Sequence, residues 1–76
     1  MNRAYLIVFR TLSGGDYFVV AFEERVWDEL ARTKELGNSL LFVLSDDAFG
    51  DTYAERIARL VRRAQEEAQR IGATIP

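Results

Sequence analysis

Two apolar segments near the N-terminus, joined by a pair of glycines, constrain the fold more than any other feature of the sequence. Residues 3–12 and 17–22 are rich in β-branched and aromatic side chains, which favour strands. Ser13, Gly14, Gly15 and Asp16 stand between the two segments. Because a Gly-Gly pair supplies the positive φ angles of tight hairpin turns, the sequence predicts an antiparallel β-hairpin.

A two-residue turn at the glycines also predicts the register of the hairpin. Ser13 then pairs with Asp16, which places Phe9 opposite Val20. With this register both faces of the hairpin are largely apolar, whereas a half-exposed antiparallel hairpin alternates apolar and polar residues. The hairpin therefore needs cover on both faces, or it leaves one apolar face exposed.

Residues 23–36 predict a first helix, because their apolar side chains recur at helical spacing on one stripe. Trp27 belongs to this stripe, so we expect it in the core rather than at an interface. Gly37 and Asn38 end the helix as a left-handed cap. Residues 39–45 are a short apolar run between turn signals, which is typical of a buried third strand.

A second helix is the strongest helical prediction in the chain. Thr52 and Glu55 have the spacing of a capping box at its start. One apolar face then continues through five turns to Ile71, and Gly72 ends the helix.

The order ββαβα predicts one domain over residues 1–76, an α/β (α+β) fold built as a two-layer sandwich. The simplest order of its three-stranded mixed sheet is 2-1-3, with the first strand antiparallel to both neighbours, and 1-2-3 is the alternative. Two helices cover the sheet. Both helices then tend to fall on one face, leaving Leu6, Val8 and Val19 exposed on the other. Such a patch marks an interface, for instance in a homodimer, unless the helices lie on opposite faces.

The composition argues against an enzyme. The 76 residues include no histidine and no cysteine, so the commonest general bases, nucleophiles and zinc ligands are missing. We expect no catalytic residue and no cofactor. Residues 13–16 lack the following helix that a phosphate-binding glycine loop needs. No segment has the length of a membrane span or the pattern of a signal peptide, which predicts a cytoplasmic protein.

The acidic loop around residues 46–51 offers the best metal candidate. Asp46, Asp47, Asp51 and Glu55 supply the oxygen ligands that calcium or magnesium prefers, but their spacing misses the EF-hand pattern. Negative charge at a helix N-terminus is the simpler role for the last two. Phe49, in the same loop, is either a plug over the core or an anchor for a partner.

Arginines on the second helix are candidates for a phosphate-binding face. They are Arg56, Arg59, Arg62, Arg63 and Arg70. Glutamates stand four residues from most of them, which is typical of a solvated helix face. Because the net charge of the chain is −2, we expect no direct contact with nucleic acid.

Two resemblances bear on function. The Gly-Gly hairpin and the helix start Gly50-Asp51-Thr52-Tyr53-Ala54-Glu55 resemble HicB-type antitoxin domains. The whole chain, short, cysteine-free, acidic in its middle and opening Met1-Asn2-Arg3-Ala4-Tyr5-Leu6-Ile7, is similar to small phage-type anti-CRISPR proteins. The second resemblance implies a non-enzymatic inhibitor that binds a Cas subunit in the cytoplasm of a host cell.

The charge distribution agrees with such an inhibitor. Residues 16–55 contain ten acidic and three basic side chains, whereas residues 56–76 contain two acidic and five basic ones. We therefore expect an acidic surface that occludes a basic, nucleic-acid-handling protein or ribonucleoprotein. The alternatives are a HicB-like antitoxin or small homodimeric domain, and a metal-dependent enzyme on the acidic loop. The expected partner-binding residues are Glu23, Glu24, Asp28, Asp46, Asp47, Phe49 and Asp51.

Overall fold

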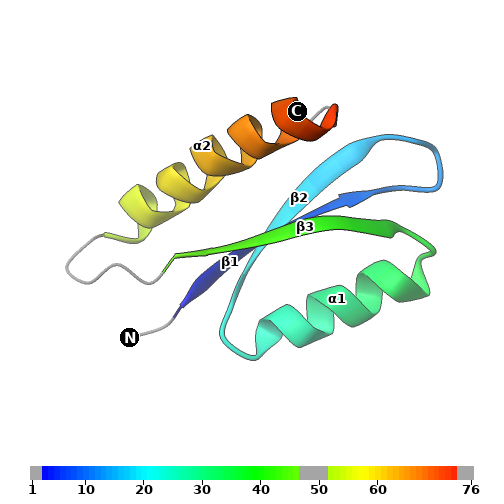
Figure 1. The fold of residues 1–76 in the computed structure, drawn as a ribbon. Helices are drawn as coiled ribbons and strands as arrows, with labels where there is room; N and C mark the ends of the chain where they lie inside the picture. The colour runs from blue at the N-terminus through cyan, green and yellow to red at the C-terminus, as the bar shows by residue number, and fades with distance from the viewer. Residues whose placement is uncertain (1–2, 47–51, 74–76) are drawn as a thin grey trace.

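The computed structural model describes residues 3–46 and 52–73, and shows a three-stranded sheet lying between two helices (Figure 1). The elements follow one another along the chain as β1 (Ala4–Arg10), β2 (Asp16–Phe22), α1 (Arg25–Glu35), β3 (Ser39–Asp46) and α2 (Tyr53–Ile71). The predicted ββαβα order is therefore confirmed, with boundaries that differ from the predicted ones by at most two residues.

The sheet has the order β2-β1-β3, as the sequence predicts. β1 is the central strand and is antiparallel to both of its neighbours. β2 and β3 run in the same direction, but each is paired only with β1, so the expected mixed sheet is antiparallel throughout. The sheet belongs to a small α+β fold.

Helix α2 covers one face of the sheet. Leu60 and Ala64 of α2 pack against Leu6 and Val8 of the central strand, and all four side chains are buried. Partly buried aromatic and aliphatic residues of β2 and β3 surround this cluster. The long apolar stripe of α2 therefore builds the larger part of the core.

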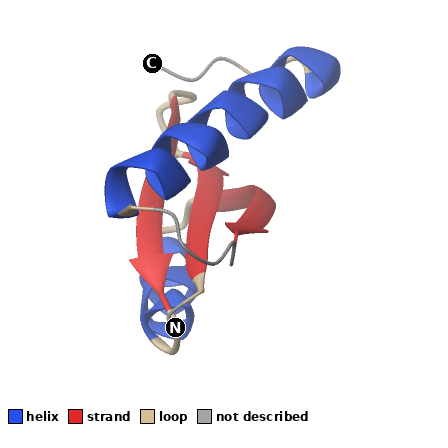
Figure 2. Ribbon diagram, turned by 90° about the vertical axis from the view of Figure 1, so that its left-hand side faces the viewer, coloured by secondary structure: helices blue, strands red, loops and turns tan. Residues whose placement is uncertain are grey.

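Helix α1 covers the opposite face. Val26 of α1 is buried against Ile7 of β1 and Ala21 of β2, and Leu30 packs on the same cluster. Figures 1 and 2 show α1 and α2 on different sides of the sheet. Ile7 is completely buried although it faces away from α2, because α1 covers it.

The layering therefore differs from the expected two-layer sandwich, because the order of layers is helix, sheet, helix. The apolar sheet face that we expected to remain open does not exist: Leu6 and Val8 lie under α2, and Val19 packs in the cluster under α1. The physical reason is that β1 is apolar on both faces, and each face requires its own helix to exclude water.

The hairpin register also differs from the expected one. Arg10 pairs with Asp16, and Val8 pairs with Phe18, so the strands are shifted by three residues relative to a Gly-Gly turn. An odd shift moves a whole set of side chains to the other face of the sheet. As a result Phe18 and Val20 face α2 together with Val8, not with the odd-numbered residues of β1.

The turn explains this shift. Gly14 N donates to Thr11 O at 3.0 Å, and Thr11 N donates to Gly15 O at 2.8 Å, which closes a three-residue loop. Gly14 has φ 93°, the left-handed conformation that ends such a loop. One glycine therefore supplies the required positive φ, where the predicted turn used both.

The helix ends agree with the sequence. Thr52 Oγ1 accepts a hydrogen bond from Glu55 N at 3.1 Å, which caps the start of α2. Gly72 ends α2 with φ 77°, and Gly37 follows α1 with φ 74°. Among the residues that the structure describes, no helix combines the length and the hydropathy that crossing a membrane requires.

Candidate functional site

The expected partner-binding residues fall into three groups in the structure. Asp47, Phe49 and Asp51 lie outside the described residues. Asp46 is the last residue of β3 and belongs to the packing between β3 and α2. The remaining three, Glu23, Glu24 and Asp28, lie together around the start of α1.

Asp46 has a structural role, because its side chain is only 7% exposed and is bound to an arginine of α2. Arg59 donates from Nε to Oδ2 at 2.6 Å and from Nη2 to Oδ1 at 3.0 Å, a two-bond geometry that fits the carboxylate. Arg63 Nη1 donates to Ser45 O at 3.0 Å. These bonds attach the end of β3 to α2 and compensate the charge of Asp46.

The arginines of α2 are therefore more than a solvated face. Arg59 and Arg63 reach across to the last two residues of β3, a contact that spacing along one helix does not reveal. Arg56 is buried, against expectation for an exposed face. Arg70 does pair along the helix, with Glu67 three residues earlier, and this hydrogen bond and charge raise the pKa of Arg70.

Asp16, a second buried aspartate, has an equivalent role at the hairpin. Arg10 donates from Nε to Oδ1 at 2.7 Å and from Nη2 to Oδ2 at 3.2 Å. The hydrogen bond to Asp16 and its negative charge raise the pKa of Arg10. Part of the acidic excess of residues 16–55 is thus neutralised within the fold.

Glu23 shapes the connection between β2 and α1. It has φ 48°, the left-handed region that non-glycine residues seldom adopt. Its Oε1 accepts a hydrogen bond from Arg3 N at 2.6 Å, and its carbonyl accepts one from Val26 N at 3.2 Å. These bonds hold the chain where it leaves the sheet, and they leave Glu23 only half exposed.

Glu24 and Asp28 are both exposed. They stand four residues apart on α1, on the side opposite Val26, Leu30 and Thr33, which face the sheet. Neither carboxylate forms a hydrogen bond or ion pair with another residue of the described ranges 3–46 and 52–73. These two side chains are therefore available to a partner, unlike Asp16 and Asp46.

Trp27 lies at the surface, although its place on the apolar stripe predicted a position in the core. Its side chain is 70% exposed. Successive helical residues are about 100° apart. Because Val26 is buried against the sheet, Trp27 points about 100° away from it, toward the side of the helix. The helix therefore presents an exposed tryptophan near two exposed carboxylates, an arrangement that its apolar pattern did not predict.

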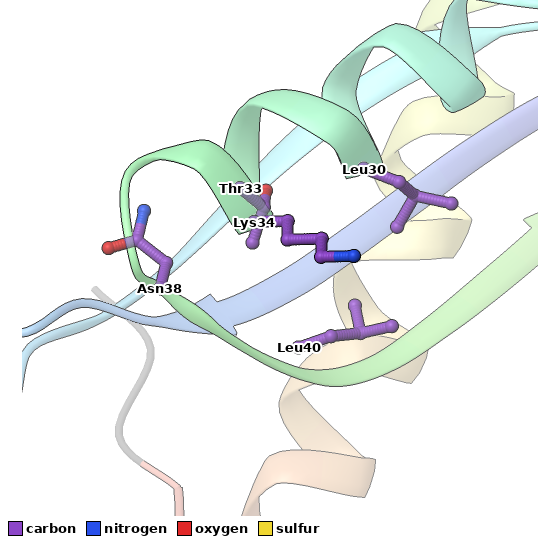
Figure 3. A pocket seen from close by; sticks show the side chains of 5 residues that line it. All are labelled: Leu30, Thr33, Lys34, Asn38 and Leu40. Atoms are coloured by element: carbon purple, nitrogen blue, oxygen red, sulfur yellow. The ribbon is translucent and has the colours of Figure 1, made fainter.

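A shallow pocket opens between α1 and β3. Its volume is about 360 Å³. Figure 3 shows Lys34 extending from α1 across the gap, with Leu40 rising from β3 on the other side. The lining residues are Leu30, Thr33, Lys34, Asn38 and Leu40.

The part of the chain that the structure describes contains no cluster of side chains that could bind a metal ion. There, no three acidic side chains come close enough to share an ion. Asp46 is bound to Arg59, and Glu55 lies in the first turn of α2, where its charge favours the helix.

Comparisons of the chain with protein-family models, with curated proteins and with solved structures find no match.

Proposed function

We propose that this protein is a non-enzymatic, protein-binding inhibitor that docks on a basic, nucleic-acid-handling partner. The observation that carries the proposal is the pair of exposed carboxylates on α1, Glu24 and Asp28, which no described residue neutralises. These two charges stay exposed to solvent, whereas the carboxylates of Asp16 and Asp46 form ion pairs with Arg10 and Arg59. Charges kept free in this way steer association with a surface of opposite sign.

The position of α1 supports this proposal. The arginines of α2 lie across the sheet from α1, so the two carboxylates face solvent on the side that α2 does not occupy (Figure 1). A basic partner that docks on this side of α1 can therefore contact both carboxylates, which lie near the exposed Arg25 and Arg32. Glu23, half exposed at the start of α1, adds negative charge to the same surface.

The mechanism is occlusion. A basic groove that normally holds nucleic acid is covered by the acidic surface of α1, and the nucleic acid is excluded sterically and electrostatically. Asp47, Phe49 and Asp51 remain expected partner-binding residues of the proposal and lie outside the described residues. A subunit of a Cas ribonucleoprotein, implied by the resemblance to anti-CRISPR proteins, is the first partner to examine, and the cytoplasm is the compartment in which the two would meet.

Affinity capture with matched variants tests the proposal. The wild-type protein, Asp28→Lys and Glu66→Lys are immobilised and exposed to purified Cas complexes at two salt concentrations. Both substitutions invert one exposed helical carboxylate, on α1 and α2 respectively. We expect Asp28→Lys, and more strongly Glu24→Lys combined with it, to lose the partner, whereas Glu66→Lys retains it.

Higher salt should weaken the wild-type complex, since surface charges are screened within about 10 Å at 0.1 M salt. Equal retention of the captured complex by the Asp28 and Glu66 variants would show that α1 is not the docking surface. If no basic nucleic-acid-handling protein binds the wild type, the inhibitor proposal itself is wrong.

A further inference from the structure

Trp27 and the pocket between α1 and β3 lie on the same side of α1. Lys34 lines the pocket and follows Trp27 by seven residues, which is two helical turns with a rotation of about 20°. The two side chains are therefore in one row, about 10 Å apart along the helix at 1.5 Å per residue. One row carries both a protruding aromatic side chain and a cavity.

The pocket has the chemistry of an aromatic binding site. Leu30 and Leu40 provide apolar walls on α1 and β3, and the flexible side chain of Lys34 spans the gap between them (Figure 3). A lysine ammonium is attracted to the face of an indole ring, which is the best of the aromatic partners for a cation. At about 360 Å³ the pocket lies within the range of sites that hold small aromatic groups.

We propose that the occupant is a second copy of this chain, in a two-fold dimer in which Trp27 of each copy enters the pocket of the other. A two-fold axis between Trp27 and Lys34 sets the two α1 helices antiparallel and makes both contacts equivalent. The same two-fold axis then buries each Trp27 side chain and fills each pocket. The cation–π contact between the indole of Trp27 and the ammonium of Lys34 therefore forms twice in each dimer.

The neighbouring edge of the sheet admits a second copy. β3 is an edge strand whose outer side has no strand partner among the described residues, and its Leu40 and Val43 are 50% and 37% exposed. Its only charged residue, Asp46, is buried against Arg59. Natural edge strands commonly carry charge that repels another strand, and β3 presents none along its exposed part.

This dimer goes beyond the proposed inhibitor function and does not compete with it. Glu24 and Asp28 point away from the sheet, whereas Trp27 and the pocket lie toward the β3 side of α1. Asp28 lies about 100° around α1 from Trp27, so the assembly can leave its carboxylate exposed in both copies. Loss of the dimer and loss of the partner are caused by different substitutions, so the two proposals can fail separately.

Light scattering coupled to size exclusion, over a range of protein concentrations, tests the dimer directly. We expect the mass to rise from one chain toward two. Trp27 is the only tryptophan, so its emission should shift to shorter wavelength and resist acrylamide quenching over the same range. A mass of one chain at every concentration up to about 1 mM overturns the proposal, as does a dimer in which Trp27 remains fully quenchable.

Two single variants and their mixture make the test specific. Trp27→Ala removes the inserted side chain, and Leu40→Glu places a charge in the pocket, so each should weaken dimerisation about thirtyfold or more, as expected for a central anchor residue. In an equimolar mixture, Trp27 of the Leu40→Glu chain still finds an intact pocket on the Trp27→Ala chain. We therefore expect the mixture to form heterodimers more readily than either variant forms homodimers.

Ile71→Ala is the matched control, because Ile71 is exposed on α2, on the other side of the sheet. It should dimerise as the wild type does. Circular dichroism verifies that each variant is folded. Homodimers of Trp27→Ala as strong as those of the wild type, or a mixture no better than its components, would contradict insertion of Trp27 into the pocket.

Discussion

The guanidinium of Arg59 donates two hydrogen bonds, of 2.6 and 3.0 Å, to the carboxylate of Asp46. They attach the last residue of β3 to the second turn of α2. The aspartate is buried, while the arginine is about one-third exposed. Asp46, like Asp16, is thus buried in an ion pair within the fold, whereas Glu24 and Asp28 remain exposed.

Asp46→Asn should therefore destabilise the protein by about 2–3 kcal/mol, because it removes the charge that compensates a partly buried guanidinium. Urea unfolding measures this change. Asp28→Asn, at an exposed position, should stay within about 0.5 kcal/mol of the wild type. A loss for Asp46→Asn no larger than that for Asp28→Asn would mean that the pair does little for stability.

A substitution on the face of β1 that α1 covers tests whether both faces of this strand are buried. Ile7 is completely buried beneath α1, so Ile7→Val should cost about 1 kcal/mol, as deletion of one buried methyl group typically does. Thermal or urea unfolding provides the measurement. If that face were open to solvent, the substitution would be nearly neutral, and the helix–sheet–helix order would be wrong.

The hairpin loop depends on the left-handed backbone of Gly14. A Cβ at this position meets no atom within 4 Å, so Gly14→Ala has only a conformational cost, about 1 kcal/mol. Gly14→Asn should cost less, since asparagine tolerates this region better. Equal stability of the alanine variant and the wild type in urea would indicate a different turn.

The cap of α2 rests on one side chain. Thr52→Ala removes the acceptor for Glu55 N and should cost about 1 kcal/mol, whereas Thr52→Ser retains the hydroxyl and most of the stability. Unfolding curves of the two variants, recorded side by side, separate the hydrogen bond from the loss of size. An equal loss for serine and alanine would exclude the hydroxyl as the cause.

Local signals in the sequence predicted the elements and their order well. The capping residues Thr52 and Gly72 mark the ends of α2 by short-range chemistry, which is why their prediction was accurate. The sheet order followed from the connection lengths and the usual pairing of sequential strands. The hairpin register was wrong because two loops of different length can use the same Gly14-Gly15 pair.

Longer-range features were harder to predict. Which face α1 covers depends on how the chain leaves Glu23, whose positive φ has no signature in the sequence. The burial of Asp46 depends on Arg59, thirteen residues away in the chain and on another element. Trp27 was misplaced because the stripe of α1 that touches the sheet is narrower than its apolar pattern.

Placing the first strand at the centre of the sheet has a consequence for biosynthesis. β1 and β2 can pair as soon as both have been synthesised, but neither face of β1 is covered until α1 and then α2 arrive. The partner of β1 on its other edge, β3, begins some thirty residues later in the chain. A nascent chain that ends before α2 therefore exposes Leu6 and Val8, and truncated products should aggregate or recruit chaperones while the complete chain folds cooperatively.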